Sequence, residues 1–234
     1  MDRPDHLIVG LGTRNRLVEL RRCITSIAST IGLPVKIVVA FDEDYASYCE
    51  LHDYPYVGKV LLQPRHYYCR MMNALYRKMH EVADEEGSTH FVLAHDDSEY
   101  ALWDWGNRAL DLHMGAYPDG NGVIDLFGPS MCSHYISTFK FIDEQHNGQL
   151  ADPRYTMYYS DSDMLNKLAE KTQYAAIEGM GIFRHMTMST HDALTAEVTR
   201  TWKDLDREEY ERRWPKEYAQ ELKKNWKIAK MDRG

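Results

Sequence analysis

The sequence has few cysteines, no long apolar run and no excess of positive charge. Its 234 residues include four cysteines, which are widely spaced and form no Cys-x-x-Cys pair, so a disulfide framework is not indicated. No apolar stretch approaches the roughly 20 residues that a membrane helix requires, and no signal peptide follows Met1. These absences favour a cytoplasmic protein with reduced thiols and no transmembrane segment.

The balance of charge is acidic, with a net charge of −8. This argues against a protein built for non-specific nucleic-acid binding. It is compatible with a local basic cleft, because the first third of the chain carries several arginines: Arg14, Arg16, Arg21, Arg22, Arg65, Arg70 and Arg77.

The first half of the chain alternates strand-like and helix-like segments. Short apolar runs predict strands, and apolar residues at helical spacing predict helices between them. The expected strands are His6–Leu11, Val35–Phe41, Val57–Leu62 and Phe91–Ala94, with helices over 17–31, 68–86 and 100–117. This order predicts an α/β domain with a mostly parallel sheet flanked by helices.

The second half is less regular. A strand is expected over Val123–Phe127, a helix over Asp161–Lys171, and a short strand or loop over Gly181–Met186. The stretch 128–153 is aromatic and loop-rich, which is typical of a substrate-binding insertion.

The C-terminal stretch is highly charged, with tryptophans interspersed. We expect one or two helices there, broken at Pro215 and packed through their tryptophans. The chain is accordingly divided into a domain over 1–190 and a helical extension over 191–234.

The most informative motif is Asp96-Asp97, directly after the apolar run Phe91–Ala94. Adjacent carboxylates at a strand end repel each other, so keeping both ionised requires a cation beside them. Hard oxygen ligands suit Mg²⁺ or Mn²⁺ shared with substrate phosphates. The alternative is that the pair caps the helix expected from about Tyr100.

Four segments in this order resemble the family 2 glycosyltransferases of the GT-A fold. They are Thr13–Arg16 after the first strand, Asp42 after the second, the DXD-like pair Asp96-Asp97, and the downstream Ser160–Met164. The resemblance covers roughly residues 7–185. It implies an inverting, metal-dependent glycosyltransferase, a hexosyl- or pentosyltransferase that uses a nucleotide-sugar donor, foremost a UDP-sugar.

The resemblance also implies a donor site. Thr13, Arg14, Asn15 and Arg16 lie between the first strand and the helix that follows it. Their amides and guanidinium groups would therefore face the edge of the sheet where ligands bind. Asp42 would hydrogen-bond the nucleotide base, although Asp42-Glu43-Asp44-Tyr45 stands where the family has Asp-Asp-Gly-Ser. A donor-contacting arginine is implied near Asn73, and both Arg65 and Arg70 are candidates.

The acidic pair takes two roles by this resemblance. Asp96 would contact the donor sugar and ribose, and Asp97 would hold a divalent cation, Mn²⁺ or Mg²⁺. His185 lies where many GT-A enzymes place a late metal ligand, with His191 as the nearest substitute. An imidazole ligand would favour Mn²⁺.

The general base is expected in the second acidic segment. By resemblance it is Asp161, which would take the proton of the acceptor hydroxyl as it attacks. Asp163 would support it or cap the helix. The alternative is that both residues form an N-cap doublet without a catalytic role.

Two other functions remain open. A degenerate GT-A domain would bind a sugar or a partner without catalysis. The segment Gly10–Arg14 also resembles the phosphate loop of sugar nucleotidyltransferases, but no Pro-Lys pair follows it before Lys36. No motif in the region 128–159 identifies the acceptor, whether lipid, polysaccharide, protein or nucleic acid.

Overall fold

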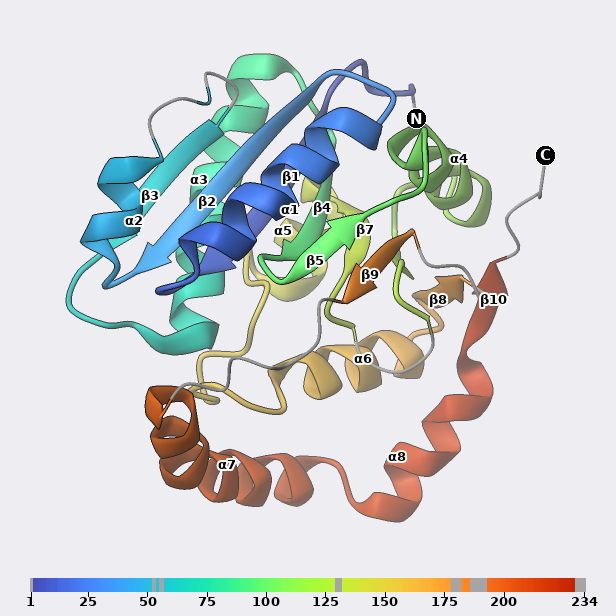
Figure 1. Ribbon diagram of the computed structural model, residues 1–234. Helices are drawn as coiled ribbons and strands as arrows, with labels where there is room; N and C mark the ends of the chain where they lie inside the picture. The colour runs from blue at the N-terminus through green and yellow to red at the C-terminus, as the bar shows by residue number, and fades with distance from the viewer. Residues whose placement is uncertain are drawn as a thin grey trace.

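The structure, a computed structural model, describes residues 2–51, 54, 57–128, 132–177, 182–185 and 193–229, and only the backbone of 183–185 and 193–201. Strands and helices alternate through the first half of the chain (Figure 1). The strands are β1 (Leu7–Thr13), β2 (Val35–Asp42), β3 (Val57–Leu62), β4 (His90–His95), β5 (Ser98–Tyr100), β6 (Val123–Asp125), β7 (Tyr135–Thr138), β8 (Tyr174–Ile177), β9 (Phe183–His185) and β10 (Lys227–Ala229). The helices are α1 (Leu17–Thr30), α2 (Tyr45–Glu50), α3 (Tyr67–Glu86), α4 (Trp105–Ala116), α5 (Phe139–His146), α6 (Ser160–Glu170), α7 (Ala193–Arg213) and α8 (Lys216–Leu222).

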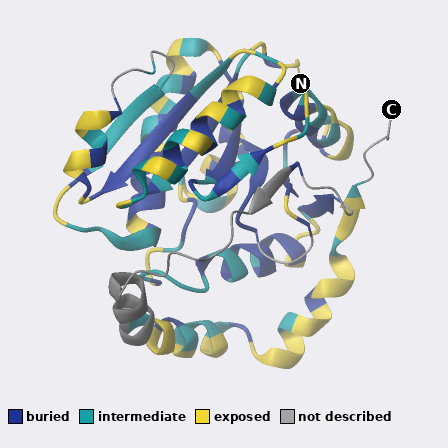
Figure 2. Ribbon diagram, viewed as in Figure 1, coloured by how far each residue is buried: buried dark blue, intermediate teal, exposed yellow. Residues whose placement is uncertain are grey.

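Within the described residues, eight strands form one sheet in the order β10-β8-β6-β7-β4-β1-β2-β3. Strand β7 runs antiparallel to both β4 and β6, and the other paired strands are parallel. The predicted α/β class with a mostly parallel sheet is therefore confirmed. Its central strands are buried on both faces (Figure 2), which explains why they are short continuous apolar runs.

Helices cover both faces of the sheet. Helices α3, α5 and α6 pack on one face, where Met72 and Leu75 of α3 join Ile8 and Phe91 of the strands. Helices α1 and α4 pack on the other face. The two hydrophobic layers hold the ends of the strands in a fixed arrangement.

Gly10 on β1 allows α3 to approach the sheet closely. A Cβ atom at this position would overlap Sδ of Met79. This glycine is therefore explained by the packing of a helix on a strand, because the missing side chain leaves room for the methionine.

The structure differs from the expected elements between residues 98 and 146. The helix expected from Tyr100 begins at Trp105, because 98–100 forms β5 and pairs with β9. The stretch expected to be loop-rich contains β7 and α5. Strand β7 is short but fully buried between β4 and β6, and Oγ1 of Thr138 caps α5 by accepting from the amide of Phe141 at 3.1 Å.

The C-terminal stretch forms helices and also returns to the sheet. Helices α7 and α8 flank Pro215, in line with the expected break. Beyond them β10 adds an edge strand beside β8 (Figure 1), which the charged sequence did not indicate. None of the described helices combines the length and the apolar character that crossing a membrane requires.

Candidate functional site

The carboxyl ends of β1, β2 and β4 meet at one edge of the sheet because these strands are parallel neighbours. Thr13 ends β1, Asp42 ends β2, and Asp96 follows directly after β4. The topology thus brings together three segments that are far apart in the sequence. Ligands of open α/β sheets bind at this edge.

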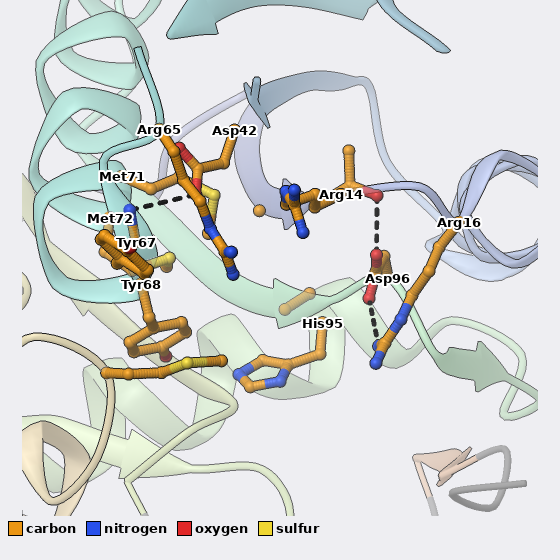
Figure 3. A pocket seen from close by; sticks show the side chains of 14 residues that line it. Arg14, Arg16, Asp42, Arg65, Tyr67, Tyr68, Met71, Met72, His95 and Asp96 are labelled. Carbon is orange, nitrogen blue, oxygen red and sulfur yellow. Dashed lines mark hydrogen bonds and ion pairs between the residues drawn. The ribbon is translucent and has the colours of Figure 1, made fainter. Parts of the chain in front are cut away.

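A cavity of about 220 Å³ opens at this edge (Figure 3). Arg14 lies between Asp42 and Asp96 in this view, and Arg65 lies beside Asp42. The cavity is lined by Gly12, Thr13, Arg14, Arg16, Asp42, Arg65, Tyr67, Tyr68, Met71, Met72, Ala94, His95, Asp96 and Met157. Of the predicted donor-site residues, Asn15 and Arg70 are absent from this lining.

Arg16 bridges the two adjacent carboxylates. Its Nη1 lies 3.3 Å from Oδ1 of Asp96 and 3.3 Å from Oδ2 of Asp97. The hydroxyl of Thr13 donates to the other oxygen of Asp96 at 2.7 Å. The cation that the sequence requires beside the pair is thus supplied, in this structure, by an arginine side chain.

Asp96 is almost completely buried, with 5% of its surface exposed. Burial raises the pKa of this carboxyl group to about 6, against the opposing effects of Arg16 and Thr13. A cationic group arriving beside it would favour the ionised form.

Asp42 links β2 to the start of α3. Its two carboxylate oxygens accept from the amides of His66 at 2.6 Å and Tyr67 at 3.0 Å. The guanidinium of Arg65 lies 4.4 Å from the ring centroid of Tyr67, and its Nε lies 3.9 Å from Asp42. The predicted base-binding aspartate therefore also caps a helix, and it lines the cavity.

The two candidate arginines of this region lie in different places. Arg65 is 17% exposed at its side chain and lines the cavity. Arg70 is exposed on α3. The geometry therefore favours Arg65 for contact with a ligand.

Asn15 shapes the β1–α1 loop from outside the cavity. It adopts a left-handed backbone with φ of 55°, a conformation that asparagine tolerates better than most residues. Its amide donates to Oδ2 of Asp44 at 2.7 Å, and Oδ1 of Asp44 accepts from the amide of Ser47 at 3.2 Å. Asp44, which the sequence analysis did not single out, thus ties this loop to α2. An aspartate directly before a helix, at the N-cap position, is the signal that would have revealed it.

The residues available for a metal ion are only partly described. The backbone pairing of β5 with β9 sets residue 185 opposite Ser98, the residue after Asp97. The side chain of His185 and the whole of His191 lie outside the described residues. Among the described side chains, no group of three or more His, Cys, Asp or Glu residues is arranged to hold a metal. Of the predicted ligands, Asp97 is the one whose side chain is described, and a carboxylate suits a cation that is shared with substrate phosphates.

Asp161 and Asp163 lie in different environments at the start of α6. Asp161 is half-buried, and its Oδ1 accepts from the amide of Ser162 at 2.8 Å. Burial, followed by the nearby charge of Asp161, raises the pKa of Tyr68, which lines the cavity. Asp161 is therefore close enough to influence a group in the cavity wall.

Asp163 is fully buried in an ion-pair network. Its Oδ1 lies 2.6 Å from Nη1 of Arg213 and accepts from Nε1 of Trp214 at 2.7 Å, and its Oδ2 lies 2.7 Å from Nζ of Lys167. Through these contacts Asp163 connects α6 to the end of α7. Asp161 takes no part in these contacts.

Comparisons with known proteins show the fold. No family model and no curated protein matches the sequence. Among solved structures, the chain is similar to the mannosyltransferase PcManGT of Pyrobaculum calidifontis, determined with GDP-Man and Mn²⁺, with a TM-score of 0.56 and 13% identity over 95% of this chain and 74% of that one. A structure of S. aureus TarS 1–349 with UDP has a TM-score of 0.49 and 8% identity over 70% of this chain and 55% of that one. The chain therefore shares the fold of PcManGT.

Proposed function

We propose that the protein is a metal-dependent glycosyltransferase that moves a sugar from a nucleotide-diphosphate donor to an acceptor hydroxyl, with inversion. The observation that carries the proposal is the pairing of Asp96 and Asp97 with Arg16 at the carboxyl edge of the sheet. It is supported by the fold shared with PcManGT, whose structure holds GDP-Man and Mn²⁺.

The cavity suits a ligand that carries phosphates. Arg14, Arg16 and Arg65 line it, and guanidinium groups bind phosphate in bidentate fashion. The Nε of Arg14 is buried and hydrogen-bonds to no described residue. Asp42 and Asp96 supply acceptors for the hydroxyl and amide donors of a nucleotide.

A divalent cation, Mn²⁺ or Mg²⁺, would be held by Asp97 together with donor phosphates, and His185 is the proposed further ligand. Such an ion supplies neutralisation of the charge that develops on the departing nucleoside diphosphate. For the ion to reach Oδ2 of Asp97, the guanidinium of Arg16 would turn from that oxygen toward the phosphates.

The proposed general base is Asp161. It is half-buried and near the cavity wall, and its position in the first turn of α6 places it at the positive end of the helix dipole. An ionised carboxylate there would accept the proton of the attacking hydroxyl. A UDP-sugar remains the foremost donor from the sequence resemblance, and the acceptor stays undefined.

The proposal is tested by calorimetric titration with a panel of nucleoside diphosphates, each with and without Mn²⁺. We expect one nucleotide to bind only when the metal is present. Asp97→Ala is the variant that should lose this dependence, and the exposed Glu208→Ala is the control that should keep it. Failure of every nucleotide to bind the wild-type protein would favour a domain that has lost catalysis.

A further inference from the structure

One face of α7, with the residue just beyond it, contacts the start of α3, the segment that leads into α6, and α6 itself. The contacting residues are spaced by four, four, three and one along the chain, so they form a stripe on one side of the helix and just beyond it. They are Trp202, Asp206, Tyr210, Arg213 and Trp214. Figure 1 shows α7 below α6, at the edge of the molecule.

Asp206 is the most specific of these contacts. Its carboxylate is 3% exposed and accepts from three consecutive amides, those of Thr156 at 3.0 Å, Met157 at 2.9 Å and Tyr158 at 2.8 Å. Hydrogen bonds to an ionised acceptor are stronger than neutral ones. A single side chain of α7 thus fixes the backbone of three residues in a loop.

The same loop is held from the opposite side by α3. The carbonyl of Thr156 accepts from the amide of Cys69 at 3.3 Å. Further along, the rings of Tyr159 and Tyr210 stack with their centroids 5.1 Å apart. The loop is therefore clamped between the helix that lines the cavity and the C-terminal helix.

This clamped loop adjoins the candidate site. Met157 lines the cavity, and Asp161, three residues after Tyr158, is the second residue of α6. Trp202, one turn before Asp206, has its ring centroid 5.7 Å from that of Tyr67, another residue of the cavity lining. Contacts of α7 therefore reach both the cavity wall and the segment that carries the proposed base.

We propose that Asp206 is a positioning residue that sets the place of Asp161 relative to the cavity, an inference that rests on the proposed function. The carboxylate of Asp206 holds the amides of 156–158 in place. Because this loop leads directly into α6, it determines the position of the first turn of α6, which contains Asp161. Small misplacements of a reacting group can lower a rate by about 10²-fold. Helix α7 would thus contribute to sugar transfer by positioning Asp161.

The test compares Asp206→Ala and Asp206→Asn with Glu208→Ala. Glu208 is exposed two residues further along the same helix, so its removal deletes one carboxylate without touching the loop. The readouts are metal-dependent nucleotide affinity, kcat and KM for release of nucleoside diphosphate from the donor, and hydrogen exchange of the amides of 156–158.

We expect Asp206→Ala to lower kcat by about 30- to 100-fold while nucleotide affinity and donor KM stay within about twofold of wild type. Exchange at 156–158 should accelerate. Asp206→Asn keeps one acceptor oxygen and should recover part of kcat. Glu208→Ala should match wild type in every readout.

Three outcomes would overturn the proposal. The first is a wild-type kcat in Asp206→Ala despite faster hydrogen exchange at the amides of 156–158. The second is a parallel loss of nucleotide affinity and kcat in this variant. The third is unchanged hydrogen exchange at these amides. If Asp206→Ala does not fold, Asp206→Asn decides, since a wild-type kcat in that variant would contradict positioning. If the wild-type protein neither binds nucleotide nor releases it from a donor, the proposed function fails. A fully active Asp206→Ala beside an active wild type removes the positioning role alone.

Discussion

Thr13 donates its hydroxyl to Oδ2 of Asp96 at 2.7 Å, across 83 residues of sequence. The bond joins the ends of two parallel strands, β1 and β4, at the wall of the cavity. It holds one oxygen of Asp96 and leaves the other to Arg16, so the orientation of this carboxylate depends on both partners.

Replacing Thr13 with Val removes this bond while keeping the branched shape of the side chain. Asp96 then loses a donor to its charged form, so we expect nucleotide affinity to fall by about tenfold, which corresponds to about 1.4 kcal/mol. Calorimetric titration with Mn²⁺ present measures the change. Thr13→Ser keeps the hydroxyl and should bind within about twofold of wild type. Equal affinities of the Val and wild-type proteins would show that the bond does not orient Asp96.

Asp161→Asn tests the proposed base. The amide is nearly isosteric with the carboxylate but cannot accept the acceptor proton, so we expect kcat to fall by about 10²- to 10⁴-fold. Nucleotide affinity should be unchanged. Donor turnover and calorimetry on the same preparation separate the two effects. Near-normal turnover would assign the base to another residue.

Asp163→Ala should act on stability. The carboxylate is fully buried between Lys167 and Arg213, and its loss leaves both cations and Nε1 of Trp214 without this acceptor. Breaking a buried ion pair in this way costs about 3–5 kcal/mol. Urea unfolding measures the loss, and Asp161→Ala, two residues away and outside the network, should lose less than about 1 kcal/mol. Similar unfolding midpoints for the two variants would contradict the network's role.

Buried histidines should make stability depend on pH. The rings of His90 and His113 lie 5.1 Å apart, and burial together with His113 lowers the pKa of His90 from 6.5 to about 3. Between these values the folded protein binds fewer protons than the unfolded chain, so stability is full above pH 6.5 and falls as the pH decreases.

His90→Leu removes the contribution of His90 to this dependence. Relative to the variant, the wild-type protein should lose up to about 1.4 kcal/mol for each pH unit below the ordinary histidine pKa. Urea unfolding from about pH 7 to about pH 4 measures the two slopes. Parallel curves for the two proteins would show that His90 does not titrate on unfolding.

The sequence was sufficient to predict the edge of the sheet where the site lies. Thr13, Asp42 and Asp96 each follow an apolar run, and parallel pairing brings such positions together.

Other features depend on contacts that local pattern does not encode. Strand β7 is only four residues long, and it is defined by its two antiparallel neighbours. Asp206 lies in a charged helix, where an aspartate is usually solvent-exposed, and its partner Thr156 is 50 residues away. The sequence alone does not indicate whether Arg65 or Arg70 contacts a ligand. The structure separates them, because Arg65 lies just before α3 with its Nε 3.9 Å from Oδ2 of Asp42.

The central claim is that a nucleotide sugar is cleaved at this site with the help of a metal ion. The most direct measurement is release of nucleoside diphosphate from a panel of nucleotide sugars, with and without Mn²⁺, with water as the acceptor. We predict that one donor is consumed only with metal present, and that Asp97→Ala abolishes this consumption while Glu208→Ala does not. Release from no donor above the level of Asp97→Ala would contradict the account.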